Sequence, residues 1–178
     1  MEGIALTLQT PVADRSFTVG HEYDQLCELI DQHDCVSFDL YDTALLRNVL
    51  YPTDIFELAG WKLQIPHFKK KRIKAEAEAR NRSDREDIHL DDIYDVLSGM
   101  IGHETSLRAR QVELETEEEF TTANRFIKRV YDYAVSQNKR ILFLSDMYLP
   151  EDFLIRLLLR NGYDRFEQLW VSNRIGLS

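Results

Sequence analysis

The sequence is short of the features that would place it in several protein classes. Its 178 residues include only two cysteines, Cys27 and Cys35, which form neither a disulfide framework nor a metal-ligand spacing. No apolar stretch approaches the ~20 residues that a membrane span needs. Residues 1–20 lack a basic start followed by an apolar run, so we expect no secretory signal. These absences predict a cytoplasmic protein with reduced cysteines and no membrane partner.

An excess of basic residues is also missing. Lys and Arg number 22 against 31 Asp and Glu, which gives a formal charge of -9. Nucleic-acid-binding proteins usually display a net basic face, so we expect no nucleic-acid partner. The basic run at residues 68–74 (FKKKRIK) is expected to be the solvated face of a helix. The length suits one globular domain with an inserted subdomain.

Short apolar segments and helical patterns alternate along the chain. Three segments are expected to form strands: residues 35–40, 140–144 and 168–172. Six are expected to form helices: residues 21–33, 52–63, 66–80, 89–100, 106–136 and 150–161. The helix over residues 106–136 is expected to be continuous, with a bend near Thr121 and Thr122. Residues 1–20 have weak periodicity and are expected to form a loosely attached arm.

The order of these segments predicts an α/β fold with a parallel sheet of about three strands. Parallel strands need helical crossovers, and the connection between the first two strands is far too long for a plain one. We therefore expect an α/β core of residues 1–47 and 137–178, with an all-helical cap at residues 48–136. An incomplete sheet would leave an exposed strand edge, through which we expect a homodimer to form.

Polar residues follow the first two predicted strands directly. Residues 35–43 (CVSFDLYDT) place Asp39 at the end of the first strand, and residues 141–150 (ILFLSDMYLP) place Ser145 at the end of the second. In an open parallel sheet, groups at the carboxyl ends of neighbouring strands share one crevice, where ligands bind. The sequence therefore predicts an active site at this end of the sheet.

Asp39 carries the clearest chemistry in that crevice. A carboxylate can attack phosphorus in line and form an aspartyl-phosphate that water then hydrolyses. Because both the nucleophile and the phosphate are anionic, a cation is needed, and Mg²⁺ is usually held by one or two carboxylates, waters and the substrate phosphate. The hydroxyls of Thr43 and Ser145 can bind phosphoryl oxygens. Asp146 either lines the crevice or caps the next helix.

These stretches resemble motifs I and II of the haloacid dehalogenase-like (HAD) superfamily of phosphohydrolases. In particular, the chain resembles a group of predicted hydrolases encoded near polysaccharide-biosynthesis and glycosyltransferase genes, through residues 37–47 (SFDLYDTALLR), 145–150 (SDMYLP) and 161–164 (NGYD). The resemblance implies a Rossmann-like parallel core with a helical cap that closes over the site. It also implies a Mg²⁺-dependent phosphatase acting on a small phosphorylated metabolite such as a sugar phosphate. Asp39 would be the nucleophile and a metal ligand, with the backbone carbonyl of Tyr41 as a second ligand.

Arg72 and Arg80 of the predicted cap also fit that group. Together with Glu76 they are spaced by four residues and share one helix face. They could contact a sugar or an anionic leaving group, or they could form salt bridges along the helix. Glu115 and Glu119 of a later acidic run could pair with them inside the cap.

Two departures from the family pattern leave alternatives open. Tyr41 stands where the family usually has an Asp as general acid and base, and Asp42 would need a sharp turn to replace it, so Tyr41 or Asp42 is expected to be a poor proton shuttle. Tyr at this position resembles the dehalogenase branch, which attacks carbon without a metal. The sequence also ends at Ser178, before the Lys and the acidic metal ligands of the family, so it is either a piece of a longer protein or a short chain that has lost competence. We therefore expect weak or no turnover from this chain alone, and a catalytically degenerate binding or regulatory module is a further alternative.

Overall fold

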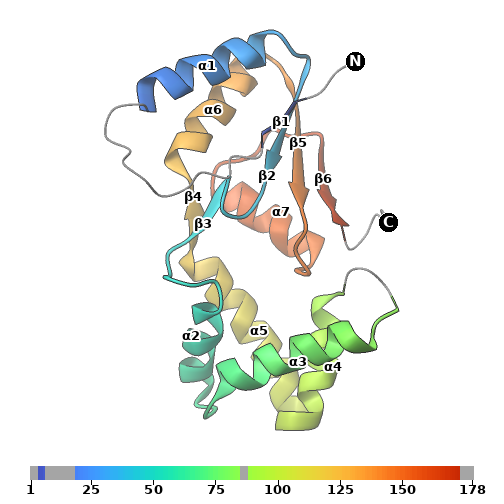
Figure 1. Ribbon diagram of the computed structural model, residues 1–178. Helices are drawn as coiled ribbons and strands as arrows, with labels where there is room; N and C mark the ends of the chain where they lie inside the picture. The colour runs from blue at the N-terminus through green and yellow to red at the C-terminus, as the bar shows by residue number, and fades with distance from the viewer. Residues whose placement is uncertain (1–3, 7–18, 85–87, 173–178) are drawn as a thin grey trace. The chain divides into compact units, whose positions relative to one another are not determined.

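A computed structural model describes residues 4–6, 19–84 and 88–172 (Figure 1). Within these ranges the chain forms six strands and seven helices. In chain order they are β1 Ile4–Leu6, α1 Val19–Asp31, β2 Cys35–Asp39, β3 Leu45–Arg47, α2 Asp54–Leu63, α3 Phe68–Arg82, α4 Leu90–Ile101, α5 His103–Phe120, β4 Thr121–Ala123, α6 Arg125–Ser136, β5 Arg140–Ser145, α7 Glu151–Arg160 and β6 Gln168–Val171.

Four of these strands form one sheet, in the order β1–β2–β5–β6. β2 pairs in parallel with both β1 and β5, and Phe38 lies opposite Phe143. Parallel neighbours need a crossover connection, and the one between β2 and β5 contains the helices α2 to α5. The predicted α/β fold with a helical insert is therefore confirmed, and β1 adds one strand to the three that the sequence predicts.

The expectation of a loose arm at residues 1–20 is wrong where the structure describes that segment. Ile4–Leu6 forms the edge strand β1, and α1 already begins at Val19. A strand of three residues is too short to show an alternating pattern, so the sequence did not reveal it. The rest of the expected arm lies outside the described residues.

The chain divides into two compact units over the described residues. The first, here called the sheet unit, comprises Met1–Leu46, Ala123–Ser145 and Leu158–Trp170. The second, here called the helical unit, comprises Arg47–Thr122, Asp146–Leu157 and Val171–Ser178. α6 belongs to the sheet unit, in which it packs against α1 and β5 (Figure 1).

The single helix expected over residues 106–136 is also wrong. The structure has α5, then the short strand β4, and then α6. Thr121 and Thr122 are β-branched and favour an extended backbone, which here pairs with β3. Asn124 then starts α6, because its side chain accepts a hydrogen bond from the Phe126 amide at 3.1 Å.

The core of the sheet unit is aromatic. Phe38 of β2 and Phe143 of β5 have ring centroids 5.8 Å apart, and Tyr131 of α6 contacts both rings. Tyr163 adds edge-on contacts at 4.9 Å to Tyr131 and 5.5 Å to Phe143. Such pairs contribute about 0.5–1.5 kcal/mol each beyond the burial of their area. This cluster fixes β2 against β5, the two strands that end at the candidate site.

The helical unit is built by α2 to α5, whose neighbours in the chain pack against one another (Figure 1). α2 and α3 approach closely at Gly60, where an added Cβ would lie 2.7 Å from the Cβ of Phe68. Glycine therefore allows these two helices to come close. Along α4, Ile93 and Leu97 are buried on one face, as their helical spacing predicts.

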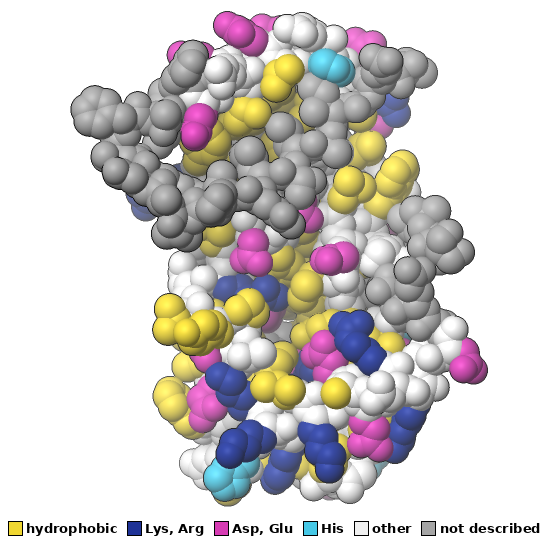
Figure 2. Space-filling view, in the orientation of Figure 1, with side chains coloured by type: hydrophobic (Ala, Val, Ile, Leu, Met, Phe, Trp, Pro, Cys, Tyr) yellow, Lys and Arg dark blue, Asp and Glu magenta, His cyan; other side chains and the backbone are white. Residues whose placement is uncertain are grey.

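The surface of the helical unit carries charges of both signs. In the basic run at residues 68–74, Lys70 and Lys74 are exposed, and Lys69 forms a 2.6 Å salt bridge with Asp54. Figure 2 shows Lys and Arg side chains interspersed with Asp and Glu on this face. The run therefore lies on a partly solvated helix face, as expected. Across the part of the chain that the structure describes, no helix is both long and apolar enough to cross a membrane.

Candidate active site

Asp39, the predicted nucleophile, and Thr43, a predicted phosphate-binding residue, lie close together at the end of β2. Asp39 ends β2 with its side chain half-buried, and Thr43 is 5% exposed. The Oγ1 of Thr43 donates a hydrogen bond to the Oδ2 of Asp39 at 2.9 Å. A hydrogen bond to a charged group contributes about 1.5–3 kcal/mol to stability. This contact therefore fixes the rotation of the Asp39 carboxylate.

The backbone between these two residues forms a compact turn. The Ala44 amide donates to the Asp39 carbonyl at 3.2 Å, and the Leu45 amide donates to the Leu40 carbonyl at 2.8 Å. Asp42 has a left-handed backbone with φ of 58°, which Asp tolerates better than most residues. The chain thus makes at Asp42 the sharp turn that Asp42 would need to act in place of Tyr41.

Tyr41 and Asp42 differ in their access to solvent. Tyr41 is 8% exposed, whereas the side chain of Asp42 is exposed. A proton shuttle must exchange its proton with solvent or substrate. Of the two expected shuttles, the exposures favour Asp42, and the catalytic role of either residue stays a prediction.

Ser145 ends β5, the neighbour of β2 in the sheet. Asp39 lies opposite Leu144, and the Leu40 amide donates to the Leu144 carbonyl at 3.0 Å, so the two strand ends are tied together. Ser145 is buried, whereas Asp146 is exposed and begins a segment of the helical unit. The sheet unit therefore brings the candidate nucleophile and the two predicted hydroxyls to the carboxyl ends of adjacent strands.

Among the described residues, Arg72 is the largest residue whose side chain is fully buried. Its guanidinium donates to both carboxylate oxygens of Glu113, at 2.8 Å and 3.0 Å, and to Glu76 at 3.1 Å. The guanidinium carbon lies 4.4 Å from the ring centroid of Phe56 and 5.2 Å from that of Tyr148. Bidentate pairing of this kind is strong and directional. These partners all belong to the helical unit, which favours a structural role for Arg72 over contact with a substrate.

Burial and the Glu113 carboxylate set the protonation states of the groups around Arg72. Burial acts to lower the pKa of Arg72, but the Glu113 carboxylate together with Tyr148 and Tyr94 outweighs that effect and holds the pKa above its usual value. Tyr94 donates to Glu113 at 2.6 Å, and burial together with that carboxylate raises the pKa of Tyr94 well above normal. Burial also raises the pKa of Tyr148. The arginine therefore stays charged and both tyrosines stay protonated at neutral pH.

Arg80 lies further along α3 and is 48% exposed at its side chain. It donates to Glu76 at 3.1 Å, which is the salt bridge along the helix that the sequence offered as an alternative. The prediction that Arg72 pairs with Glu115 or Glu119 is wrong, because Arg72 pairs with Glu113. Glu119 instead forms a salt bridge with Lys62 at 2.6 Å. Contact between Arg80 and a substrate stays a prediction.

The expected metal ligands are the carboxylate of Asp39 and the backbone carbonyl of Tyr41. Among the described residues, no group of three or more His, Cys, Asp or Glu side chains is placed to hold a metal ion. Mg²⁺ often binds through one or two carboxylates, with waters and substrate phosphates completing its shell. One carboxylate and one backbone carbonyl of the same loop fit that sparse kind of site and do not fit a cage built from protein side chains alone.

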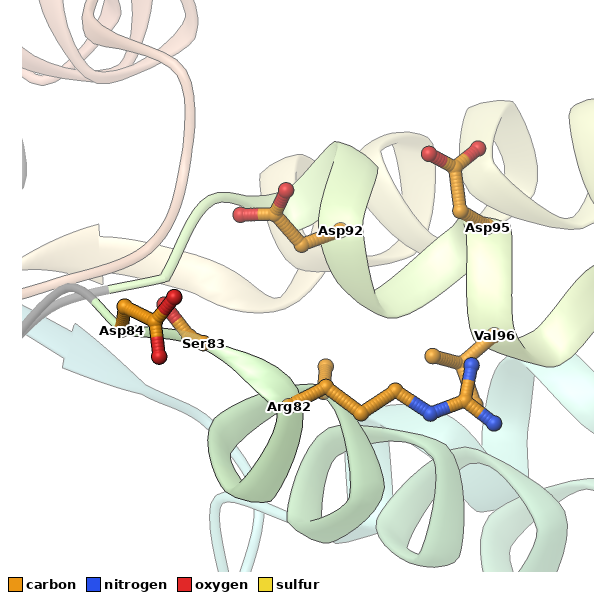
Figure 3. Close-up of a pocket in the computed structure, with 7 residues that line it drawn as sticks. Arg82, Ser83, Asp84, Asp92, Asp95 and Val96 are labelled. Atoms are coloured by element: carbon orange, nitrogen blue, oxygen red, sulfur yellow. The ribbon is translucent and has the colours of Figure 1, made fainter.

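A pocket of about 460 Å³ lies in the helical unit (Figure 3). Its lining includes Arg82, Ser83, Asp84, Asp92, Asp95 and Val96. Asp92 accepts a hydrogen bond from the His89 amide at 2.8 Å and so caps α4, and Arg82 pairs with Glu78 on its own helix. Helix-end contacts account for these two charged side chains, and the pocket contains none of the predicted site residues.

One contact to the Asp39 loop was missed at the sequence level. The hydroxyl of Tyr163 donates to the Ala44 carbonyl at 2.8 Å, and the Asn124 amide donates to the same carbonyl at 2.9 Å. The available signal was residues 161–164 (NGYD), which resemble a family motif but do not themselves predict this contact.

Comparison with known proteins supports the fold. No protein-family model and no curated protein matches the sequence. Eight chains of solved structures match, among them a Thermotoga maritima protein provisionally assigned as a beta-phosphoglucomutase, with a TM-score of 0.56 and 10% sequence identity. The fold is HAD-like. The match covers 82% of this chain and 64% of that chain, so this chain spans less than two thirds of the other structure's length.

Proposed function

We propose that this chain is a phosphohydrolase of the HAD type that acts through Asp39 on a small phosphorylated metabolite such as a sugar phosphate. The observation that carries the proposal is the 2.9 Å hydrogen bond from Thr43 to the Asp39 carboxylate at the carboxyl end of β2, beside the strand that ends in Ser145. A carboxylate held in one orientation at this end of a parallel sheet suits a nucleophile. The shared fold of the Thermotoga maritima protein is consistent with phosphoryl chemistry.

The reaction would proceed in two displacements at phosphorus. A carboxylate oxygen of Asp39 forms a bond to phosphorus while the bond to the leaving oxygen breaks, and the leaving oxygen takes a proton. Water then attacks the same phosphorus, the bond to Asp39 breaks, and inorganic phosphate is released with the carboxylate restored. The Ser145 hydroxyl would donate to a phosphoryl oxygen, whose negative charge increases as the bonds exchange. The single proton of the Thr43 hydroxyl would stay on the Asp39 carboxylate and keep the nucleophile oriented.

The weak point of this mechanism is proton transfer. The buried phenol of Tyr41 is poorly placed to exchange protons with solvent, and Asp42 has the exposed carboxylate of the loop. A positioned general acid or base typically contributes about 10²–10⁴-fold to a rate, so a poor shuttle predicts slow turnover. When bound, Mg²⁺ would neutralise charge on the phosphate, with Asp39 and the Tyr41 carbonyl as its protein ligands.

The test measures phosphate release from p-nitrophenyl phosphate and a panel of sugar phosphates in Mg²⁺, with the unchanged chain and Asp39→Asn. The isosteric amide keeps the shape of the site but removes the nucleophile, so turnover should vanish. Asp34→Asn is the matched control, because Asp34 is exposed and precedes the same strand. Turnover that persists in Asp39→Asn, or its absence from the unchanged chain, contradicts the proposal.

The burial of Tyr41 at the usual acid/base position favours a second candidate. That candidate is hydrolysis at carbon, in which Asp39 would displace halide from a halogenated acid without a metal. Halide release that survives a chelator would support it over the phosphatase. A third candidate, a binding or regulatory module, would bind phosphate mimics such as vanadate with no turnover of either substrate class.

A further inference from the structure

One backbone atom of the loop that carries Asp39 and Thr43 accepts two hydrogen bonds from outside the loop. The Ala44 carbonyl accepts hydrogen bonds from the Tyr163 hydroxyl at 2.8 Å and from the Asn124 amide at 2.9 Å. We propose that Tyr163 is a positioning residue that holds this loop so that the Thr43 hydroxyl stays on the Asp39 carboxylate. The proposal deepens the proposed function, and its kinetic test rests on that function.

The Tyr163 side chain is well fixed for this task. It is fully buried, and its ring contacts the rings of Tyr131 and Phe143 edge-on at 4.9 Å and 5.5 Å. The Nζ of Lys128 lies 5.7 Å from the ring centroid. Gly162 precedes it with φ of 80°, a backbone conformation that glycine adopts without strain. The hydroxyl therefore reaches the loop from a rigid part of the sheet unit.

The hydrogen bond from Tyr163 acts on the nucleophile because Ala44 lies next to Thr43 in the chain. Ala44 follows Thr43 directly, so a shift of its peptide moves the residue that orients the nucleophile. The loop's own bond from the Ala44 amide to the Asp39 carbonyl is 3.2 Å, at the long end of the usual range, and the Leu45 amide adds a 2.8 Å bond to the Leu40 carbonyl. Without the Tyr163 hydroxyl, the Ala44 carbonyl still accepts from the Asn124 amide, so the loss should loosen the loop without leaving a buried carbonyl unpaired.

The test uses Tyr163→Phe, with Tyr131→Phe as a matched control. Both tyrosines are buried in the same aromatic cluster, but the Tyr131 hydroxyl accepts from the Arg165 amide at 2.6 Å and not from the loop. Each Phe keeps the ring, so both variants should fold. Any general loss of stability should be similar in the two, and a difference between them therefore isolates the contact with the loop.

The first readout is amide hydrogen exchange of the full chain at Ala44 and Leu45, both of which are hydrogen-bonded within the loop. After correction for global stability, Tyr163→Phe should exchange about tenfold faster at these amides, while Tyr131→Phe should match the unchanged chain. A tenfold change corresponds to about 1.4 kcal/mol, the scale of one hydrogen bond. Equal exchange in both variants would overturn the proposal.

The second readout separates kcat from KM with p-nitrophenyl phosphate. Tyr163→Phe should lower kcat about tenfold and change KM by less than about twofold, because the loop orients the nucleophile more than it binds substrate. The control should keep both constants. An unchanged kcat in Tyr163→Phe overturns the proposal. If the unchanged chain shows no turnover, the proposed function fails, and the exchange experiment alone still decides whether Tyr163 positions the loop.

Discussion

Replacing Arg72 with Met should destabilise the helical unit far more than replacing any exposed arginine there. Met keeps much of the aliphatic stem, so the substitution removes the guanidinium and leaves a small cavity. What is lost is the bidentate bond to Glu113, the bond to Glu76 and the stacking on Phe56. Glu113 would remain buried as an anion with Tyr94 as its remaining donor.

The size of the effect follows from the burial of both partners. The side chains of Arg72 and Glu113 are 0% and 2% exposed. Removing one partner of a buried ion pair costs about 3–5 kcal/mol, because the other charge is left uncompensated. Arg80 also pairs with Glu76 but is half-exposed, and an exposed pair contributes about 0–1 kcal/mol. Arg72→Met should therefore cost several times more than Arg80→Met.

Urea unfolding followed by far-UV circular dichroism measures this difference. The midpoint should fall strongly in Arg72→Met and little in Arg80→Met, with similar slopes if both variants unfold from the same native state. A double variant, Arg72→Met with Glu113→Leu, removes both charges. It should recover part of the lost stability, because burying neither charge avoids the desolvation cost.

Two results would refute this reasoning. If Arg72→Met costs no more than Arg80→Met, the guanidinium is not buried against Glu113 in solution. If the double variant is less stable than Arg72→Met alone, the cost does not come from the stranded carboxylate. A substrate role for Arg72 would be indicated instead if the single variant kept its stability and raised KM.

Contacts elsewhere give further expectations. Burial holds the pKa of Tyr94 above its unfolded value of about 10, so its contribution to stability is complete below that pH and is lost as the pH rises through the folded pKa. As the pH rises from about 8 to about 11, the melting temperature should therefore fall further for the unchanged chain than for Tyr94→Phe. Thr43→Val should lower kcat about tenfold or more by removing the hydroxyl on the nucleophile, while Thr43→Ser should keep most of the activity. Gly60→Ala should cost about 1–3 kcal/mol in urea unfolding because its new Cβ would meet the Cβ of Phe68 at 2.7 Å. Gly99→Ala, which meets no atom within 4 Å, should be neutral or stabilising by up to about 1 kcal/mol.

The sequence predicts the strands that frame the candidate site because those strands are buried. β2 and β5 are short apolar segments that end at Asp39 and Ser145. Both the apolar segment and the polar residue that ends it can be recognised in the sequence. The burial of Arg72 is not visible in this way. A charged residue counts as polar in every pattern, and its partner Glu113 lies 41 residues away on another helix.

Tertiary pairing also explains the other errors. Thr121–Ala123 is extended because it pairs with β3, and no glycine or proline marks the break between α5 and α6. Asn124, a favoured residue at helix starts, was the available local signal. The left-handed turn at Asp42 follows from closure of its loop, which nothing in the local sequence requires.

The pairing of β2 with β5 also has a consequence for synthesis on the ribosome. Cys35 pairs with Arg140 and Asp39 with Leu144, partners that are about a hundred residues apart in the chain. At about 5–20 residues per second, β2 waits roughly 5–20 s for its neighbour to be made. During that interval the nascent chain presents an apolar strand without its central partner, and the helices of the insert, whose contacts are more local, can form first. We therefore expect this apolar strand to be exposed to aggregation while the insert is being translated.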